Sequence, residues 1–327
     1  MEGCPWQTVS SKKGTKKRIN KIRTEIGGEG TTSWESGCQD NEVDCGKIKL
    51  KIQQAKEELT TSTFWYFCQR LIEDCFSKFV EQIKEKPSFR VEDIRPGEEP
   101  SSTPLHQQDT QLVPEPGEGA LGSRHEFNCV CYGVGRFSSC ITSRYQLALL
   151  LLLLEKLQVP KHRCRVFDPL FSRWEIAILQ ALGLTVVFEN EEGKHKILTP
   201  TIFYMIHCGK ALYNNLLWRN WSVDSLSKVI IIGNSFKRIE ERLLARILMR
   251  DYVYISKILK QTEETAFPED PQYLAMFSDT SVHWFPVQKL KEVPSEMWLP
   301  AEEPAYLECE ELEIIRNQRQ GNKIVGP

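Results

Sequence analysis

The fold is decided by the stretch FNCVCYGVG at residues 127–135. Its apolar residues predict a short buried strand over 127–132, and Gly133 and Gly135 allow the backbone to turn tightly directly after it. A long helix follows from Ser138 to Leu157 and is apolar on most of its sides, which predicts a central, buried position. A strand, a glycine turn and a buried helix are the typical opening of a parallel α/β sheet.

The same alternation continues along the chain. Further buried strands are predicted at 165–167, 185–188, 201–206 and 229–232, with a last edge strand at 282–285. Helices are predicted from the capping box of Ser172 and Glu175 to Gly183, and at 212–218, 238–249 and 252–259. The link from 188 to 201 is short and has no obvious helix. Because strands and helices alternate along the chain, we expect a Rossmann-like three-layer α/β domain with a mostly parallel sheet over residues 124–290.

The flanking segments differ in composition from this domain. Residues 1–46 are predicted to be a disordered basic tail, 47–86 a helical segment, 87–123 a Pro-rich linker and 291–327 an acidic C-terminal segment. The basic residues between Lys12 and Arg23 suggest a nuclear import signal or nucleic-acid contact, with a solvated tail as the alternative. The amphipathic helix at 62–83 must bury its apolar face either on the following domain or on a protein partner.

Composition excludes several classes of protein. The chain has 327 residues, Lys+Arg 42 against Asp+Glu 44 and a formal net charge of −2, so direct nucleic-acid binding is not expected. It has no apolar run of about 18 residues, so no membrane-spanning helix is expected. Its beginning lacks an apolar signal region, so the eleven cysteines are expected to be reduced thiols. These features predict a cytoplasmic protein, with the nucleus as a second location through the basic tract.

Polar residues and glycines follow four of the predicted strands. In parallel sheets, ligands bind at the carboxyl ends of the strands, where the strand order reverses. The candidate ligand-binding residues are Gly133, Gly135 and Ser138, then Asp168, then His207, Gly209 and Asn214, and finally Gly233, Asn234 and Ser235. The alternatives are a tight packed turn at the glycines and local turn chemistry at Asp168. These residues predict a small-molecule pocket, but they identify neither a cofactor nor a catalytic set.

Histidine and cysteine patterns do not identify a reaction. His207 and Cys208 are neighbours and would point to opposite sides of a strand end, which favours a capping or buried histidine over a nucleophile and base. The sequence contains no Cys-x-x-Cys pair, so no metal site is predicted. Direct haem binding through Cys4, His207 or His283 is a third hypothesis that no spacing supports.

Several of these segments together resemble the sensitivity-to-red-light-reduced (SRR) family. The resemblance rests on VCYGVG at 130–135, DPLF at 168–171, FYMIHCG at 203–209, LYNNLLW at 212–218, IGNSF at 232–236 and DTSVHWF at 279–285. It covers about residues 60–318. It implies an intracellular regulatory protein connected with circadian clock-gene expression and haem biosynthesis, and it brings no established catalytic residue, cofactor or partner. The competing hypothesis, drawn from the predicted fold, is an enzyme or sensor that binds S-adenosylmethionine or a dinucleotide at the strand ends.

Overall fold

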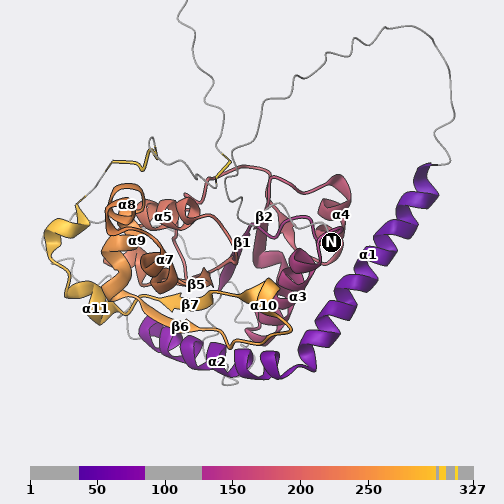
Figure 1. Ribbon diagram of the computed structural model, residues 1–327, viewed down its shortest axis with the longest axis horizontal. Coiled ribbons are helices and arrows are strands. Elements are labelled where there is room, and N and C mark those ends of the chain that lie inside the picture. The colour runs from indigo at the N-terminus through magenta and orange to yellow at the C-terminus, as the bar shows by residue number, and fades with distance from the viewer. Residues whose placement is uncertain (1–36, 85–126, 300–301, 307–313, 316–327) are drawn as a thin grey trace, which may run out of the picture.

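The computed structural model describes residues 37–84, 127–299, 302–306 and 314–315 (Figure 1). The expected basic tail up to residue 36, the Pro-rich linker at 87–123 and most of the acidic C-terminal segment lie outside these described residues.

The described residues form one seven-stranded sheet in the order β3-β2-β1-β4-β5-β7-β6. The strands are β1 (Asn128–Tyr132), β2 (Cys164–Phe167), β3 (Thr185–Val186), β4 (Thr201–Met205), β5 (Val229–Asn234), β6 (Glu263–Ala266) and β7 (Thr280–Trp284). The first five strands are parallel, and only β7 is antiparallel to both of its neighbours. The predicted Rossmann-like, mostly parallel α/β architecture is therefore confirmed.

The far end of the sheet differs from the sequence-based prediction. The strand expected at the edge is β7, which lies inside the sheet, and the edge strand is β6. β6 has the sequence EETA and is half-buried to exposed, so it has no apolar pattern that would predict a strand. It forms because β7 offers its backbone groups for pairing, with Glu264 opposite His283.

Helices cover both faces of the sheet, as the three-layer prediction requires (Figure 1). The first face packs against α1 (Gly37–Thr60), α2 (Thr63–Lys84), α3 (Ile141–Lys156), α4 (Arg173–Ala181) and α10 (Leu274–Phe277). The second packs against α5 (Lys210–Arg219), α6 (Val223–Leu226), α7 (Phe236–Arg242), α8 (Ala245–Asp251), α9 (Val253–Ile258) and α11 (Val287–Lys291). The short helices η1 (Lys161–Arg163), η2 (Leu259–Gln261) and η3 (Ser295–Trp298) join these elements.

The leucine-rich helix α3 is buried on all sides along 147–154, where no residue is more than 6% exposed. One side faces the sheet, and α1 packs against the outer side through Ile52, Ala55 and Leu59. Lys56 of α1 pairs with Glu155 of α3 at 2.6 Å. Each fully buried leucine contributes about 1.5–3 kcal/mol, so this three-layer stack is a major source of stability.

The two N-terminal helices belong to the same core as the sheet. Helix α1 begins at Gly37 and therefore extends N-terminal to the expected boundary at residue 46. The apolar face of α2 lies against the domain, with Phe64, Cys68, Ile72 and Phe79 buried, so this face packs within the chain, and a protein partner for the helix stays a prediction. Gln82 secures the end of α2 by donating to the Ser227 and Phe285 carbonyls at 2.8 and 3.2 Å.

Two connections bear on the site. Residues 187–200, between β3 and β4, contain no helix, as predicted. The single helix expected at 238–249 is instead divided into α7 and α8, because Leu243 adopts an extended conformation at the end of α7. This break places Leu243 at the edge of the site described next.

Candidate functional site

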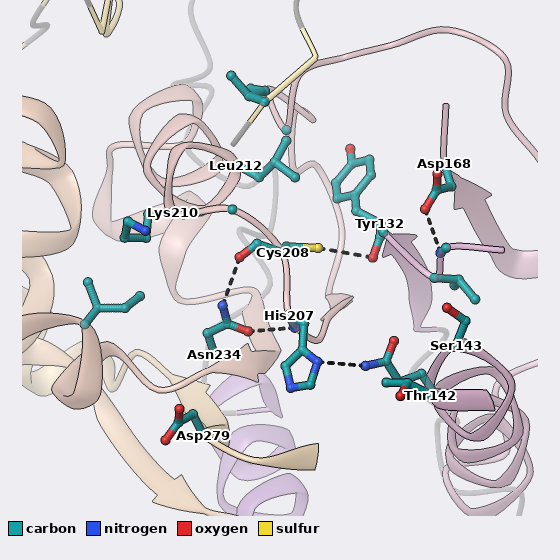
Figure 2. Close-up of a pocket in the computed structure, with 18 of the residues that line it drawn as sticks. Tyr132, Thr142, Ser143, Asp168, His207, Cys208, Lys210, Leu212, Asn234 and Asp279 are labelled. Atoms are coloured by element: carbon teal, nitrogen blue, oxygen red, sulfur yellow. Dashed lines mark hydrogen bonds between the residues drawn. The ribbon is translucent and has the colours of Figure 1, made fainter. Parts of the chain in front are cut away.

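A pocket of about 540 Å³ lies at the carboxyl ends of β1, β2, β4 and β5 (Figure 2). The strand order reverses here, because β1 lies between β2 and β4 while the chain passes from β3 to β4. The structure brings seven of the ten predicted residues into its lining: Gly133, Gly135, Asp168, His207, Gly209, Asn234 and Ser235. The predicted convergence of strand ends is therefore real, although ligand binding itself stays a prediction.

The glycine loop after β1 depends on both of its glycines. Gly133 and Gly135 have φ values of 72° and 76°, a region that glycine adopts without strain. A Cβ atom on Gly133 would lie 2.7 Å from the Cys208 Sγ, and one on Gly135 would lie 2.7 Å from the Ser143 Oγ. The tight-turn explanation therefore holds for this loop, which also forms one wall of the pocket.

Two carboxylates on the β2 side hold this loop in place by accepting hydrogen bonds from it. Asp168 accepts hydrogen bonds from the backbone N–H groups of Gly135 at 2.7 Å and Leu170 at 2.8 Å. Burial raises the pKa of Asp168, while these two hydrogen bonds oppose the rise. The local turn role predicted for Asp168 is therefore present, and the same side chain lines the pocket.

The second carboxylate, Glu175, has no solvent exposure. It accepts from the Ser138 N–H and hydroxyl at 3.0 and 2.9 Å, and it completes the predicted capping box with Ser172. Ser138 is therefore turned toward Glu175 rather than toward the pocket, and α3 begins after it, at Ile141. Ser138 does not line the pocket, because the buried Glu175 accepts from both of its donors.

His207 lies in the pocket after β4 with an unusual backbone, at φ 55°. Its N–H donates to Asn234 Oδ1 at 2.7 Å, and the Asn234 amide donates to the Cys208 carbonyl at 2.9 Å. This side-chain clamp holds the left-handed conformation, which is strained for a residue other than glycine.

Both ring nitrogens of His207 also have partners. Nδ1 accepts from the Gln146 amide at 3.1 Å, and Nε2 donates to the Ser278 carbonyl at 3.3 Å. The ring faces the pocket, yet the surrounding protein lowers the pKa of His207 by desolvation, with the Ser278 carbonyl and Asp279 opposing this. His207 is therefore a neutral, oriented polar group at the base of the pocket.

The opposite wall of the pocket carries ionic groups that the sequence analysis missed. Arg238 and Arg242 lie one turn apart on α7 and approach Asp279, with N–O distances of 3.9 and 2.6 Å. Asp279 also has a left-handed backbone, at φ 56°, and Lys210 joins the lining from the first turn of α5. The i,i+4 spacing of the arginines after β5 was the available signal for this wall.

Two further predicted residues lie outside the pocket. Asn214 is buried and faces α9, where its side chain accepts from the Tyr254 N–H at 2.9 Å and donates to the Tyr306 hydroxyl at 3.0 Å. Gly233 allows Tyr213 to pack closely, since a Cβ there would lie 2.6 Å from the Tyr213 hydroxyl oxygen. Neither residue lines the pocket, because each serves the packing of α5.

His283 and Cys208 have structural roles, and Cys4 lies outside the described residues. His283 is fully buried rather than near an edge, packs against Phe236 and has a pKa of about 4 because burial disfavours its charge while Glu264 opposes this. Cys208 is buried and donates to the Tyr132 carbonyl at 3.3 Å, which does not support a nucleophile role.

The expectation of reduced thiols holds for the seven described cysteines that are free. It is wrong for Cys140, which lines the pocket and is disulfide-bonded. Within the described residues, no group of three or more His, Cys, Asp or Glu side chains could hold a metal ion. In the same residues, no helix is both long and apolar enough to cross a bilayer.

Comparison with known proteins gives a consistent result. The model of the SRR1 domain matches residues 101–284. The SRR1-like protein of Mus musculus is 43% identical over 255 residues, which are 78% of this chain and 94% of that protein. Protein SENSITIVITY TO RED LIGHT REDUCED 1 of Arabidopsis thaliana is 28% identical over 286 residues, covering 86% of this chain and 90% of that protein. No solved structure matches the chain.

Proposed function

The chain belongs to the SRR1 domain family, and we propose that it is an SRR-like regulatory protein that acts through a small molecule held in the strand-end pocket. One observation carries this proposal. Of the segments on which the family resemblance rests, those at 130–135, 168–171, 203–209, 232–236 and 279–285 all contribute to the lining of this one pocket. They come from different strands, so a shared pocket explains why they occur together better than separate packing roles do.

At a finer level, we propose that this regulation influences clock-gene expression and haem biosynthesis. The family resemblance supports both outcomes, and the name of the Arabidopsis relative connects that protein with the response to red light. A pocket whose base is made of oriented but neutral polar groups, such as His207 and Asn234, suits ligand sensing as well as it suits catalysis.

The test is a pocket-blocking variant in cells that lack the endogenous protein. Thr142 lines the pocket from the first turn of α3, and its neighbour Ile141 is 56% exposed outside it (Figure 2). Reintroduced Thr142→Trp should fail to restore clock-gene rhythm and haem content, whereas Ile141→Trp should restore both like the wild type. Full restoration by a folded Thr142→Trp protein would contradict the proposal.

Binding of a nucleotide-type cofactor, as sensor or enzyme, is the second candidate function. The β3-β2-β1-β4-β5 order favours it, since this is the order of nucleotide-binding sheets, and Asp168 stands at the end of β2 where such sheets hold a ribose. Titration of the full chain with nucleotides tests this candidate directly.

We further propose that the protein occurs in the cytoplasm and, through its basic tract, in the nucleus. The tract has no acidic residue from Lys12 to Arg23. Alanine at Lys16, Lys17 and Arg18 should shift a fluorescently labelled chain toward the cytoplasm. An unchanged distribution would remove the import role.

A further inference from the structure

The glycine loop and the two walls of the pocket together narrow the class of ligand. Resting on the proposed ligand role of this pocket, we propose that it holds a phosphate-free nucleoside bearing an amino-acid group, of the S-adenosylmethionine or S-adenosylhomocysteine type. The arrangement of these groups favours such a ligand over a dinucleotide or a nucleoside phosphate. The loop amides, the charges beside them, the sheet and the far wall each contribute to this distinction.

Six of the eight backbone amides between residues 133 and 140 donate to acceptors within the chain. In dinucleotide-binding folds, the N–H groups of this loop and of the following helix face the pyrophosphate. Here Gly135 N donates to Asp168, and Ser138 N donates to Glu175. The neighbouring amides of the loop also donate to acceptors within the chain, namely those of Gly133, Phe137, Ser139 and Cys140. A phosphate that used any of these six amides would have to displace its bond.

The charge at this position also opposes a phosphate. Asp168 and Glu175 are 7% and 0% exposed, so water screens their negative charges weakly. Arg136 is the loop's own cation and offsets part of this charge, but it is exposed. Two buried carboxylates beside the loop favour a neutral or cationic group, such as a ribose or a sulfonium centre, over a phosphate.

The sheet provides one nucleotide-binding half instead of two. A dinucleotide site is built from two halves of parallel strands, which meet where the order reverses. In this chain β1, β2 and β3 form one complete half, whereas β5 is followed in the sheet by the antiparallel strand β7. The architecture therefore accommodates one nucleoside.

The remaining lining fits the parts of such a ligand. Each oxygen of Asp168 accepts one backbone hydrogen bond and keeps capacity for a ribose hydroxyl. Across the pocket, Arg238 and Arg242 with Asp279 present both signs of charge, which match the carboxylate and ammonium of an amino-acid group. The volume of about 540 Å³ lies within the range of small-molecule sites.

Isothermal titration calorimetry of the full chain tests this with three probes: S-adenosylhomocysteine, NAD⁺ and ATP. S-adenosylhomocysteine should bind at least about tenfold more tightly than either phosphate-containing probe and should raise the melting temperature. Equal or tighter binding of NAD⁺ or ATP would overturn the inference while supporting a ligand pocket. Absence of binding by all three would also overturn it, and the cellular test with Thr142→Trp would then decide the proposed function separately.

Two variants locate the binding. Asp168→Asn should weaken the binding of S-adenosylhomocysteine by about tenfold. Asp224→Asn is the matched control, because the Asp224 side chain is 70% exposed on α6 and does not line the pocket, and it should bind like the wild type. If Asp168→Asn does not fold, as judged by circular dichroism, Thr142→Trp replaces it and should abolish binding. Wild-type affinity in the folded variant would overturn the proposal.

Discussion

At the β1–β2 end of the pocket the loop is held by buried carboxylates, whereas at the α7 end the wall is held by an exposed ion pair. Glu175 has no exposure and takes four hydrogen bonds from Ser138 and Ser172. The side chain of Arg242, which pairs with Asp279, is 63% exposed. The hydrogen bonds to Glu175 and the Arg242–Asp279 ion pair have similar distances but differ in solvent access. We therefore expect the buried carboxylates to control stability and the exposed ion pair to contribute little to it.

The largest effect should come from Glu175→Ala. It removes the acceptor of four hydrogen bonds from the half-buried Ser138 and the exposed Ser172, together with the capping box of α4, so we expect a loss of about 3 kcal/mol in the free energy of unfolding. Urea unfolding followed by circular dichroism measures this. Glu241→Ala on α7, at a side chain 61% exposed, is the control and should change stability by less than about 0.5 kcal/mol. Similar losses in both variants would remove the distinction between the two ends.

Gly135→Ala should have the next largest effect. The new Cβ would meet the Ser143 Oγ, and alanine is strained at a φ of 76°, so we expect a loss of about 2 kcal/mol. Adding Ser143→Ala removes the steric contact but leaves the backbone strain, so the double variant should recover part of the loss. If the double variant is no more stable than Gly135→Ala, the contact with Ser143 is not a source of the effect.

His207 lies between the two ends and should give a smaller, pH-dependent effect. Burial lowers its pKa below the ordinary 6.5, so the unfolded chain binds the proton more readily. The neutral ring therefore contributes its full stability above about pH 6.5, and this contribution is lost as the pH falls below that value. Unfolding measured at pH 7.5 and 5 should show a smaller loss for His207→Asn than for the wild type, since asparagine tolerates the left-handed backbone. An equal loss of stability between pH 7.5 and 5 in both proteins would contradict the lowered pKa of His207.

The smallest effect should come from Arg242→Ala at the exposed end. We expect a change of less than about 1 kcal/mol at low salt, and no measurable difference from the wild type in 1 M NaCl, where exposed charges are screened. Urea unfolding at the two salt concentrations is the measurement. A loss as large as that of Glu175→Ala, persisting in high salt, would show that the α7 wall is structurally equivalent to the loop.

Sequence reasoning succeeded where the signal was local. The buried strands, the all-round apolar helix α3 and the capping box of Ser172 and Glu175 depend on residues within a few positions of one another. The same holds for the glycines after β1, whose turn is set by their own backbone freedom.

Sequence reasoning failed where the partner of a residue is distant in the chain. The sequence suggests that Ser138 donates to a ligand, but in the structure it donates to Glu175. The sequence likewise suggests that Asn214 is a strand-end ligand contact, but its side chain bonds to the Tyr254 amide and the Tyr306 hydroxyl. The strand β6 has no pattern of its own and exists because β7 pairs with it. Hydrogen-bond partners that are far apart in sequence leave no periodic signal.

Local patterns in the sequence were enough to predict most of the strands and helices, a mostly parallel sheet and polar groups at its strand ends, because apolar periodicity, glycine freedom and helix caps act over a few residues. Tertiary packing determines which of those polar groups face the pocket, that buried carboxylates accept from the Gly135 and Ser138 amides, and that α7 supplies two arginines to the opposite wall. Solvent access and the choice of partner determine these features, and both depend on how distant segments pack.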